Sequence, residues 1–148
     1  MTHPLHPMLV HFPIALLFVS VLFDLASTAL RRESLREGAL WLLGLGLLGG
    51  IAAAIAGGLA EHAAEKAGVA EALIETHETL AFVTIGIMAI LFLYRLLFRN
   101  RFGMKALAAY LVVAAIGLVA ISATGYTGGD LVYEHGAGMN TAPRIAGK

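Results

Sequence analysis

The amino-acid sequence predicts an all-α integral membrane protein, a four-helix up-down bundle. Hydrophobic residues make up 59% of its 148 residues and charged residues only 14%, against roughly 45–50% and about 25% in an ordinary soluble domain. A soluble globule of this size has too much surface to cover with so few charges, whereas a bilayer solvates apolar side chains directly. The composition therefore indicates a polytopic membrane protein, and the length suits one domain, residues 1–148.

Four apolar blocks are each long enough to cross a bilayer as a helix. They run over residues 13–30, 39–60, 80–98 and 106–126, close to the ~20 residues that a hydrocarbon core requires. Pro13 suits the first position of a helix and is expected to begin the first span. The connector over residues 61–78 is rich in alanine, which predicts a short interfacial helix or an extension of the neighbouring helices.

The distribution of basic residues predicts the orientation of the bundle. Cytoplasmic loops are enriched in Lys and Arg, so the side with most bases is expected to be cytoplasmic and both termini extracytoplasmic. Two out-in-out hairpins result, and residues 1–60 and 75–135 are a candidate tandem parallel repeat. Seven of the ten bases lie on one side: Arg31, Arg32, Arg36, Arg95, Arg99, Arg101 and Lys105.

Charge and cysteine content exclude several classes of protein. The net charge is zero, so the sequence lacks the basic footprint of a nucleic-acid-binding protein. It contains no cysteine, which rules out disulfides, iron–sulfur clusters on thiolates and covalently attached haem. Nothing has the spacing of a zinc protease, a Ser-His-Asp hydrolase or a phosphate loop. An enzyme is therefore not indicated, and any metal or cofactor must be held by His, carboxylate or Met.

Six histidines are the most informative residues, and the predicted topology places all of them at the outer ends of the helices. Neutral imidazole is the commonest protein metal ligand and an axial ligand of b-type haem. A layer of imidazoles at one depth therefore indicates a haem or divalent-metal site, or else interfacial histidines that pair with nearby carboxylates. The six are His3, His6, His11, His62, His77 and His135.

His11 and His77 are the pair predicted to ligate a metal or a haem iron. They lie at the expected starts of two different helices, where the backbone holds an imidazole steadily. His6 and His135 lie on segments expected to be extended or flanked by glycine, and they are predicted to be a second pair or to support the ligands. His62, just past the second span, is an alternative metal ligand.

Asp24 is the one carboxylate inside a predicted span. Such residues are expensive in hydrocarbon and are functional by default. Ser20, one turn away, and Arg95, from the third span, are its expected partners. The favoured interpretation is a structural ion pair or hydrogen-bonded lock, and the alternative is a proton relay.

These residues also carry a resemblance to a known family. The opening LHPMLVHFPI (residues 5–14), the FDL of residues 23–25, His77 and the closing GGDLVYEHG (residues 128–136) resemble the bacterial four-helix membrane family catalogued as domain of unknown function 2231. The resemblance covers essentially the whole chain and implies a multi-pass protein of the bacterial inner membrane. Some members are joined to Rieske-type iron–sulfur domains, which implies electron transfer.

The resemblance also implies which residues matter. In the family an acid followed by an aromatic residue closes the second span, whereas this chain has Glu61 and His62, so His62 is not implied as a shared ligand. Tyr133 is expected to hydrogen-bond a ligating imidazole or a haem propionate, unless it is a belt tyrosine at the interface. The positions singled out are His6, His11, Asp24, His77, Gly129, Tyr133 and His135.

Two classes of function follow from this sequence. The first is a redox module that binds b-type haem, or a metal, through the outer histidines and passes electrons to a Rieske-type extracytoplasmic protein or a quinone. The second is a non-catalytic accessory or scaffolding membrane subunit, without a cofactor or with a divalent metal such as zinc or copper. Transport is disfavoured by the small size and the single intramembrane acid.

Overall fold

The computed structural model describes residues 5–98 and 104–138. In these residues the chain forms four α-helices. Each contains a stretch long and apolar enough to cross a membrane, so the predicted all-α membrane class is confirmed. The helices are α1 (Leu5–Leu30), α2 (Glu33–Lys66), α3 (Glu71–Leu97) and α4 (Met104–Tyr133).

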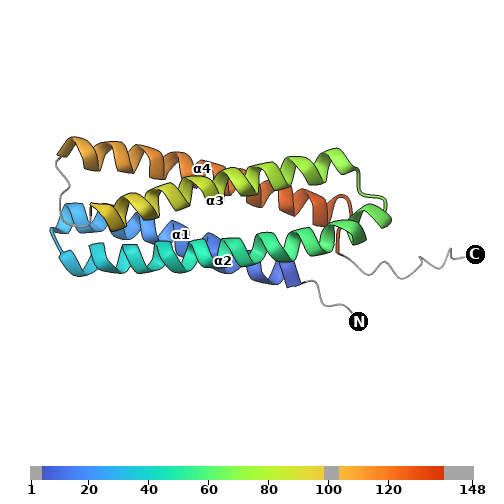
Figure 1. Cartoon of the computed structure of the whole chain (residues 1–148), viewed down its shortest axis with the longest axis horizontal. Helices are drawn as coiled ribbons and strands as arrows, with labels where there is room; N and C mark the ends of the chain where they lie inside the picture. Colours follow the sequence, from blue (N-terminus) through green and yellow to red (C-terminus); the bar gives the residue numbers. More distant parts are fainter. Residues whose placement is uncertain (1–4, 99–103, 139–148) are drawn as a thin grey trace, which may run out of the picture.

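The helices run alternately up and down along one long axis (Figure 1). The start of α1, the α2–α3 turn and the end of α4 lie together at one end of the bundle, and the α1–α2 connection lies at the other (Figure 1). The first end, called the histidine end, carries His6, His11, His62, His77 and His135, and the second, the arginine end, carries Arg31, Arg32, Arg36 and Arg95. His3, Arg99 and Arg101 lie outside the described residues.

The bundle consists of two helical hairpins. α1 packs chiefly on α2, and α3 packs chiefly on α4. Across the hairpins, α2 and α3 are in closer contact than α1 and α4, which make the least contact of the adjacent pairs. Leu17, Leu43, Met88 and Leu91 are buried in the core between the hairpins. The seam between α1 and α4 is therefore the loosest part of the bundle.

All four helices of the described residues are longer than the predicted spans, and the start of α1 and the end of α4 show the reason. α1 already includes His6, where an extended segment was expected, and Pro13 lies inside the helix and not at its first position. α4 continues to Tyr133 and includes Gly128 and Gly129. Hydropathy locates an apolar stretch but not the point where a helix ends. Proline and glycine are tolerated in membrane helices because neighbouring groups satisfy the freed backbone atoms.

The predicted short interfacial helix between the second and third spans is wrong, and the alternative of extended helices is correct. α2 and α3 are joined directly by a turn over residues 67–70. Gly68 has a φ of 90°, a conformation that glycine adopts without strain. The Gly68 N–H donates to the Glu65 carbonyl (2.9 Å) and the Val69 N–H donates to the Ala64 carbonyl (3.2 Å). This Schellman motif ends α2 and leaves no room for a separate helix.

The two hairpins share one residue register. Asp24 and Arg95 are 71 residues apart, and the same offset relates four buried positions of α1 to four buried positions of α3. In α1 these positions are occupied by Pro13, Leu17, Ser20 and Asp24, and in α3 by Thr84, Met88, Leu91 and Arg95. The faces that α1 and α3 bury are therefore equivalent.

Contacts within the hairpins follow the same register. A β-carbon added at Gly46 of α2 would lie 2.9 Å from Leu17 Cδ2, and one added at the equivalent Gly117 of α4 would lie 2.7 Å from Met88 Cε. Glycine thus allows the same close helix approach in both hairpins. Because Asp24 also contacts its own equivalent, Arg95, the hairpins are related by an approximate two-fold axis along the bundle.

The orientation in the membrane remains a prediction that labelling tests. The chain has no cysteine, so Ser34→Cys at the arginine end and Ala70→Cys in the α2–α3 turn each introduce a single thiol at an exposed position. Because basic loops stay cytoplasmic, a membrane-impermeant maleimide should label Ala70→Cys on intact cells and Ser34→Cys only after lysis. Labelling of Ser34→Cys alone on intact cells would establish the opposite orientation.

Candidate functional site

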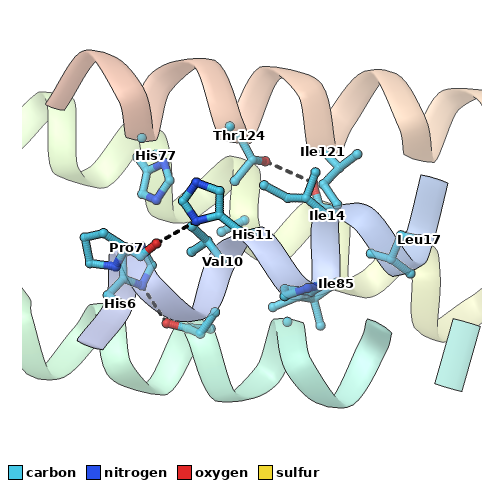
Figure 2. A pocket seen from close by; sticks show the side chains of 18 of the residues that line it. His6, Pro7, Val10, His11, Ile14, Leu17, His77, Ile85, Ile121 and Thr124 are labelled. Carbon is cyan, nitrogen blue, oxygen red and sulfur yellow. Dashed lines mark hydrogen bonds between the residues drawn. The ribbon is translucent and has the colours of Figure 1, made fainter. Parts of the chain in front are cut away.

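A cavity of about 320 Å³ lies between the four helices at the histidine end (Figure 2). All four helices contribute to its wall, which is mostly apolar side chains and glycine. An apolar cavity with a small number of convergent polar groups is the usual form of a ligand site. The polar side chains of the wall are His6, His11, His77, Thr84, Thr124 and Tyr133.

His6 of α1 and His77 of α3 form the closest pair of rings at this site. Their ring centroids are 5.9 Å apart and their planes are nearly perpendicular, at 89°. Figure 2 shows His77 pointing from α3 toward His6 on α1. The two residues are equivalent in the register of the two hairpins, so this is a second place where a residue meets its own counterpart across the approximate two-fold axis.

Glycine makes room for each of these rings. A β-carbon at Gly57 of α2 would lie 3.1 Å from His6 Cε1, and one at Gly128 of α4 would lie 2.9 Å from His77 Cε1. Real β-carbons essentially never approach a ring as closely as the second distance. Each imidazole therefore occupies space that the glycine of the neighbouring helix leaves open.

Two of the imidazoles are held by backbone carbonyls. His6 Nδ1 lies 2.7 Å from the Ala53 carbonyl oxygen, and His11 Nδ1 lies 2.8 Å from the Pro7 carbonyl oxygen. A carbonyl only accepts hydrogen bonds, so each Nδ1 must carry a proton and donate it. In the neutral ring this leaves Nε2 with its lone pair.

His77 is held in the same tautomer by a hydroxyl. Its Nδ1 lies 3.0 Å from Thr127 Oγ1. The Thr127 hydroxyl donates its own proton to the Thr124 carbonyl at 3.1 Å, so its oxygen accepts the Nδ1 proton of His77. Both members of the ring pair therefore direct their hydrogen bonds to the protein through Nδ1 and keep Nε2 as a Lewis base.

This arrangement has the form of a ligand pair and not of a closed metal cluster. Histidines that bind metals typically donate their other ring N–H to a carbonyl or a similar acceptor, which fixes the ring and raises its basicity. Within residues 5–98 and 104–138, however, no group of three or more His, Asp or Glu side chains is arranged to hold a metal ion. The site offers two imidazoles in a nearly perpendicular ring contact, and a third imidazole lines the same cavity.

The structure brings His77 together with His6, whereas the sequence pointed to His11. Because α1 starts before His6, both His6 and His11 are helical, and five residues rotate a side chain by about 140° around the helix axis. His6 therefore turns toward α2 and α3. His11 lines the same cavity, but its side chain is exposed.

The other predicted residues lie at the rim or away from the cavity. His62 is exposed and lies 3.4 Å from the Glu65 carboxylate one turn further along α2. His135 is also exposed, and its Nδ1 is 3.5 Å from the Asp130 carboxylate. Tyr133 and Gly129 both line the cavity, with the Tyr133 side chain 81% exposed.

Sequence reasoning missed the residues that position the two rings. Thr127 and Gly57 belong to no motif, and Gly128 stands out only as the first residue of the closing GGDLVYEHG segment. A signal was nevertheless present, because a Gly-Gly pair occurs at residues 57–58 and again at residues 128–129. The two Gly-Gly pairs have the same separation along the chain as His6 and His77. The repetition therefore indicates that each half of the chain places a glycine beside its histidine.

A second polar site lies at the arginine end, inside the bundle. Asp24 is 2% exposed and Arg95 is 4% exposed, and the Arg95 guanidinium donates to Asp24 Oδ1. The Tyr110 hydroxyl donates to Asp24 Oδ2 at 2.7 Å, and Arg95 also donates to the Arg36 carbonyl at 2.6 Å. Ser20, the other expected partner, donates instead to the Ala39 carbonyl at 2.8 Å.

Together these features define a small polytopic membrane protein with a histidine-lined cavity at one end and a buried ion pair at the other. The chain belongs to a family described as predicted membrane proteins, domain of unknown function 2231, whose profile matches residues 2–141. No curated protein matches the chain. No solved structure matches it either.

Removing the Tyr110 hydroxyl should destabilise the bundle. Tyr110→Phe leaves Asp24 Oδ2 buried without its donor, at an expected cost of about 1–3 kcal/mol in the free energy of unfolding. Tyr126→Phe on the same helix is the matched control, because Tyr126 is 77% exposed and should change stability little. Unfolding in detergent micelles, followed by circular dichroism, measures both. Equal stabilities of the two variants would mean that Tyr110 does not support Asp24.

Proposed function

We propose that the protein is a small redox module of the membrane that binds a b-type haem in the cavity at the histidine end, with His6 and His77 as the axial ligands. The observation that carries the proposal is the close pair of imidazoles at the cavity, whose centroids are 5.9 Å apart. Both are held through Nδ1, so both can offer Nε2 to a metal.

The spacing of the two rings suits one metal between them. A metal–imidazole nitrogen bond is about 2.0–2.1 Å long, so two imidazoles on opposite sides of one ion have ring centres roughly 6 Å apart. The observed separation is 5.9 Å. The separation of the two rings is therefore compatible with one ion between them.

The number of ligands favours haem over a bare metal ion. Structural and catalytic zinc sites use three or four protein ligands, and no such group occurs among the described residues. A haem supplies four equatorial nitrogens itself and requires at most two from the protein. The apolar and glycine-rich wall of the cavity also suits a flat hydrophobic ring better than a hydrated ion.

The chain's own residues would bind, orient and shield the group. The Ala53 carbonyl and the Thr127 hydroxyl hold the two rings, and all four helices contribute apolar side chains to the wall around the group. A bound b-type haem supplies a one-electron couple at its iron. With the orientation that the basic residues predict, this end faces the extracytoplasmic side of a bacterial inner membrane, where a Rieske-type protein or a quinone is the expected electron partner.

The second candidate is an accessory membrane subunit whose cavity binds a divalent metal such as zinc or copper. It is favoured by His11, which lines the same cavity and carries its proton on Nδ1 as the other two do. A movement of that exposed side chain toward His6 and His77 would complete a three-histidine site.

Absorption spectra separate the two functions. The purified protein should show a Soret band and a reduced-minus-oxidised haem spectrum, with about one iron per chain. His6→Ala and His77→Ala should each lose most of the iron and the Soret band, because each removes an axial ligand. His62→Ala and His135→Ala are matched controls at exposed positions and should keep both signals.

Two results would contradict the haem proposal. Full iron and an unchanged Soret band in both His6→Ala and His77→Ala would show that the pair does not ligate. Stoichiometric zinc or copper without iron, lost in those variants and in His11→Ala, would identify the metal site of the accessory subunit instead.

Adjacent glycines provide a finer test of the ring positions. Gly57→Ala introduces a β-carbon 3.1 Å from His6 Cε1, whereas a β-carbon at Gly58 meets nothing within 4 Å. Because ligands must be held close to their productive geometry, Gly57→Ala should weaken haem retention by about ten-fold or more. Gly58→Ala should retain haem like the unmodified protein. Haem transfer to apomyoglobin measures retention, and equal rates for the two variants would place the haem away from His6.

A further inference from the structure

The Asp24–Arg95 pair has a property that an ordinary buried ion pair lacks. The two residues are equivalent positions of the two hairpins, 71 residues apart, and they contact each other. A residue on a two-fold axis meets its own counterpart across the interface. If the two hairpins were identical, this buried position would bring two identical charges together. In this chain the first hairpin carries Asp24 there and the second carries Arg95, so the two charges are opposite.

Identical charges at this position would be strongly unfavourable. The Asp24 and Arg95 side chains are both buried, and two like charges in contact in a low-dielectric interior repel, while each also loses its hydration. An Asp24 facing an Asp24, or an Arg95 facing an Arg95, would bring two groups of like charge together in the interior of the bundle. A hairpin with either residue is therefore prevented from pairing with a copy of itself.

The surrounding groups stabilise only the unlike pairing. Tyr110 of α4 donates to Asp24, and the Arg36 carbonyl of α2 accepts from Arg95. The Arg95 guanidinium also lies 5.5 Å from the centroid of the Tyr110 ring. The residue equivalent to Tyr110 in the first hairpin is Ala39, which has no hydroxyl to donate. A hydroxyl donor is thus present at this position in the second hairpin and absent from it in the first.

We propose that the buried face of each hairpin is a recognition surface whose partner is selected by charge at positions 24 and 95. In the unmodified chain the α1–α2 hairpin accepts its own α3–α4 hairpin, which carries a cation at the equivalent position, and it rejects a copy of itself. The best-attested role of buried polar groups is this selection of register and partner. The proposal is independent of any cofactor at the histidine end.

Co-purification of two differently tagged full-length chains tests this rule. Asp24→Arg gives a chain with arginine at both positions, and Arg95→Asp gives a chain with aspartate at both. In either variant alone the two hairpins meet with like charges, whereas the two chains together can exchange hairpins and form a mixed dimer in which every pair is unlike. Co-expressed Asp24→Arg and Arg95→Asp should therefore co-purify, whereas two tagged copies of Asp24→Arg, or two of the unmodified chain, should not.

The double variant Asp24→Arg/Arg95→Asp provides a second measurement that does not depend on dimers. Each single variant should lower the midpoint of thermal unfolding in detergent by about 10 °C, since it breaks a buried pair. The double variant should recover at least half of that loss, with the remainder attributable to the asymmetric support from Tyr110. The proposal is overturned if Asp24→Arg co-purifies with itself as well as it does with Arg95→Asp. It is also overturned if neither the mixed chains nor the double variant recovers a folded bundle.

Discussion

The contact between Asp24 and Arg95 is the constraint on which the arrangement of the bundle depends. Hydrocarbon offers no solvation to either charge, so the two hairpins must meet where these residues lie and must align in one register. That alignment fixes the arginine end, with Tyr110 and the Arg36 carbonyl completing the contact. Since the helices are rigid, the same register determines which residues face each other about 18 residues away, at the histidine end.

At the histidine end the same symmetry produces a cavity instead of a sealed core. His6 and His77 meet near the axis, and the glycines of α2 and α4 that receive their rings remove side chains that would otherwise fill the space. α1 and α4 make the least contact of the adjacent helices, so the bundle is loosest beside this cavity. The Asp24–Arg95 pair thus fills the interior of the arginine end, whereas the histidine end contains a cavity that a ligand can occupy.

The hydrogen bonds around the cavity matter as much as the histidines themselves. An imidazole that faces a cavity can present either a donor or a lone pair, and its second nitrogen decides which. Here the Ala53 carbonyl, the Pro7 carbonyl and the Thr127 oxygen all accept from Nδ1. Three rings from two helices consequently carry the same tautomer, which is the one that leaves Nε2 available to a metal.

The sequence by itself determined the membrane class, the four helices and the gathering of the histidines at one end, because these depend on hydropathy, length and order along the chain. It also named Arg95 as a partner for Asp24, since a buried carboxylate requires a counter-charge. Only the tertiary structure decided that the His6 ring contacts the His77 ring, because that depends on where α1 begins and on the helix rotation that follows. Thr127, Gly57 and Tyr110 were likewise undetectable, because a hydroxyl or a missing side chain acquires its role only from the atoms packed against it.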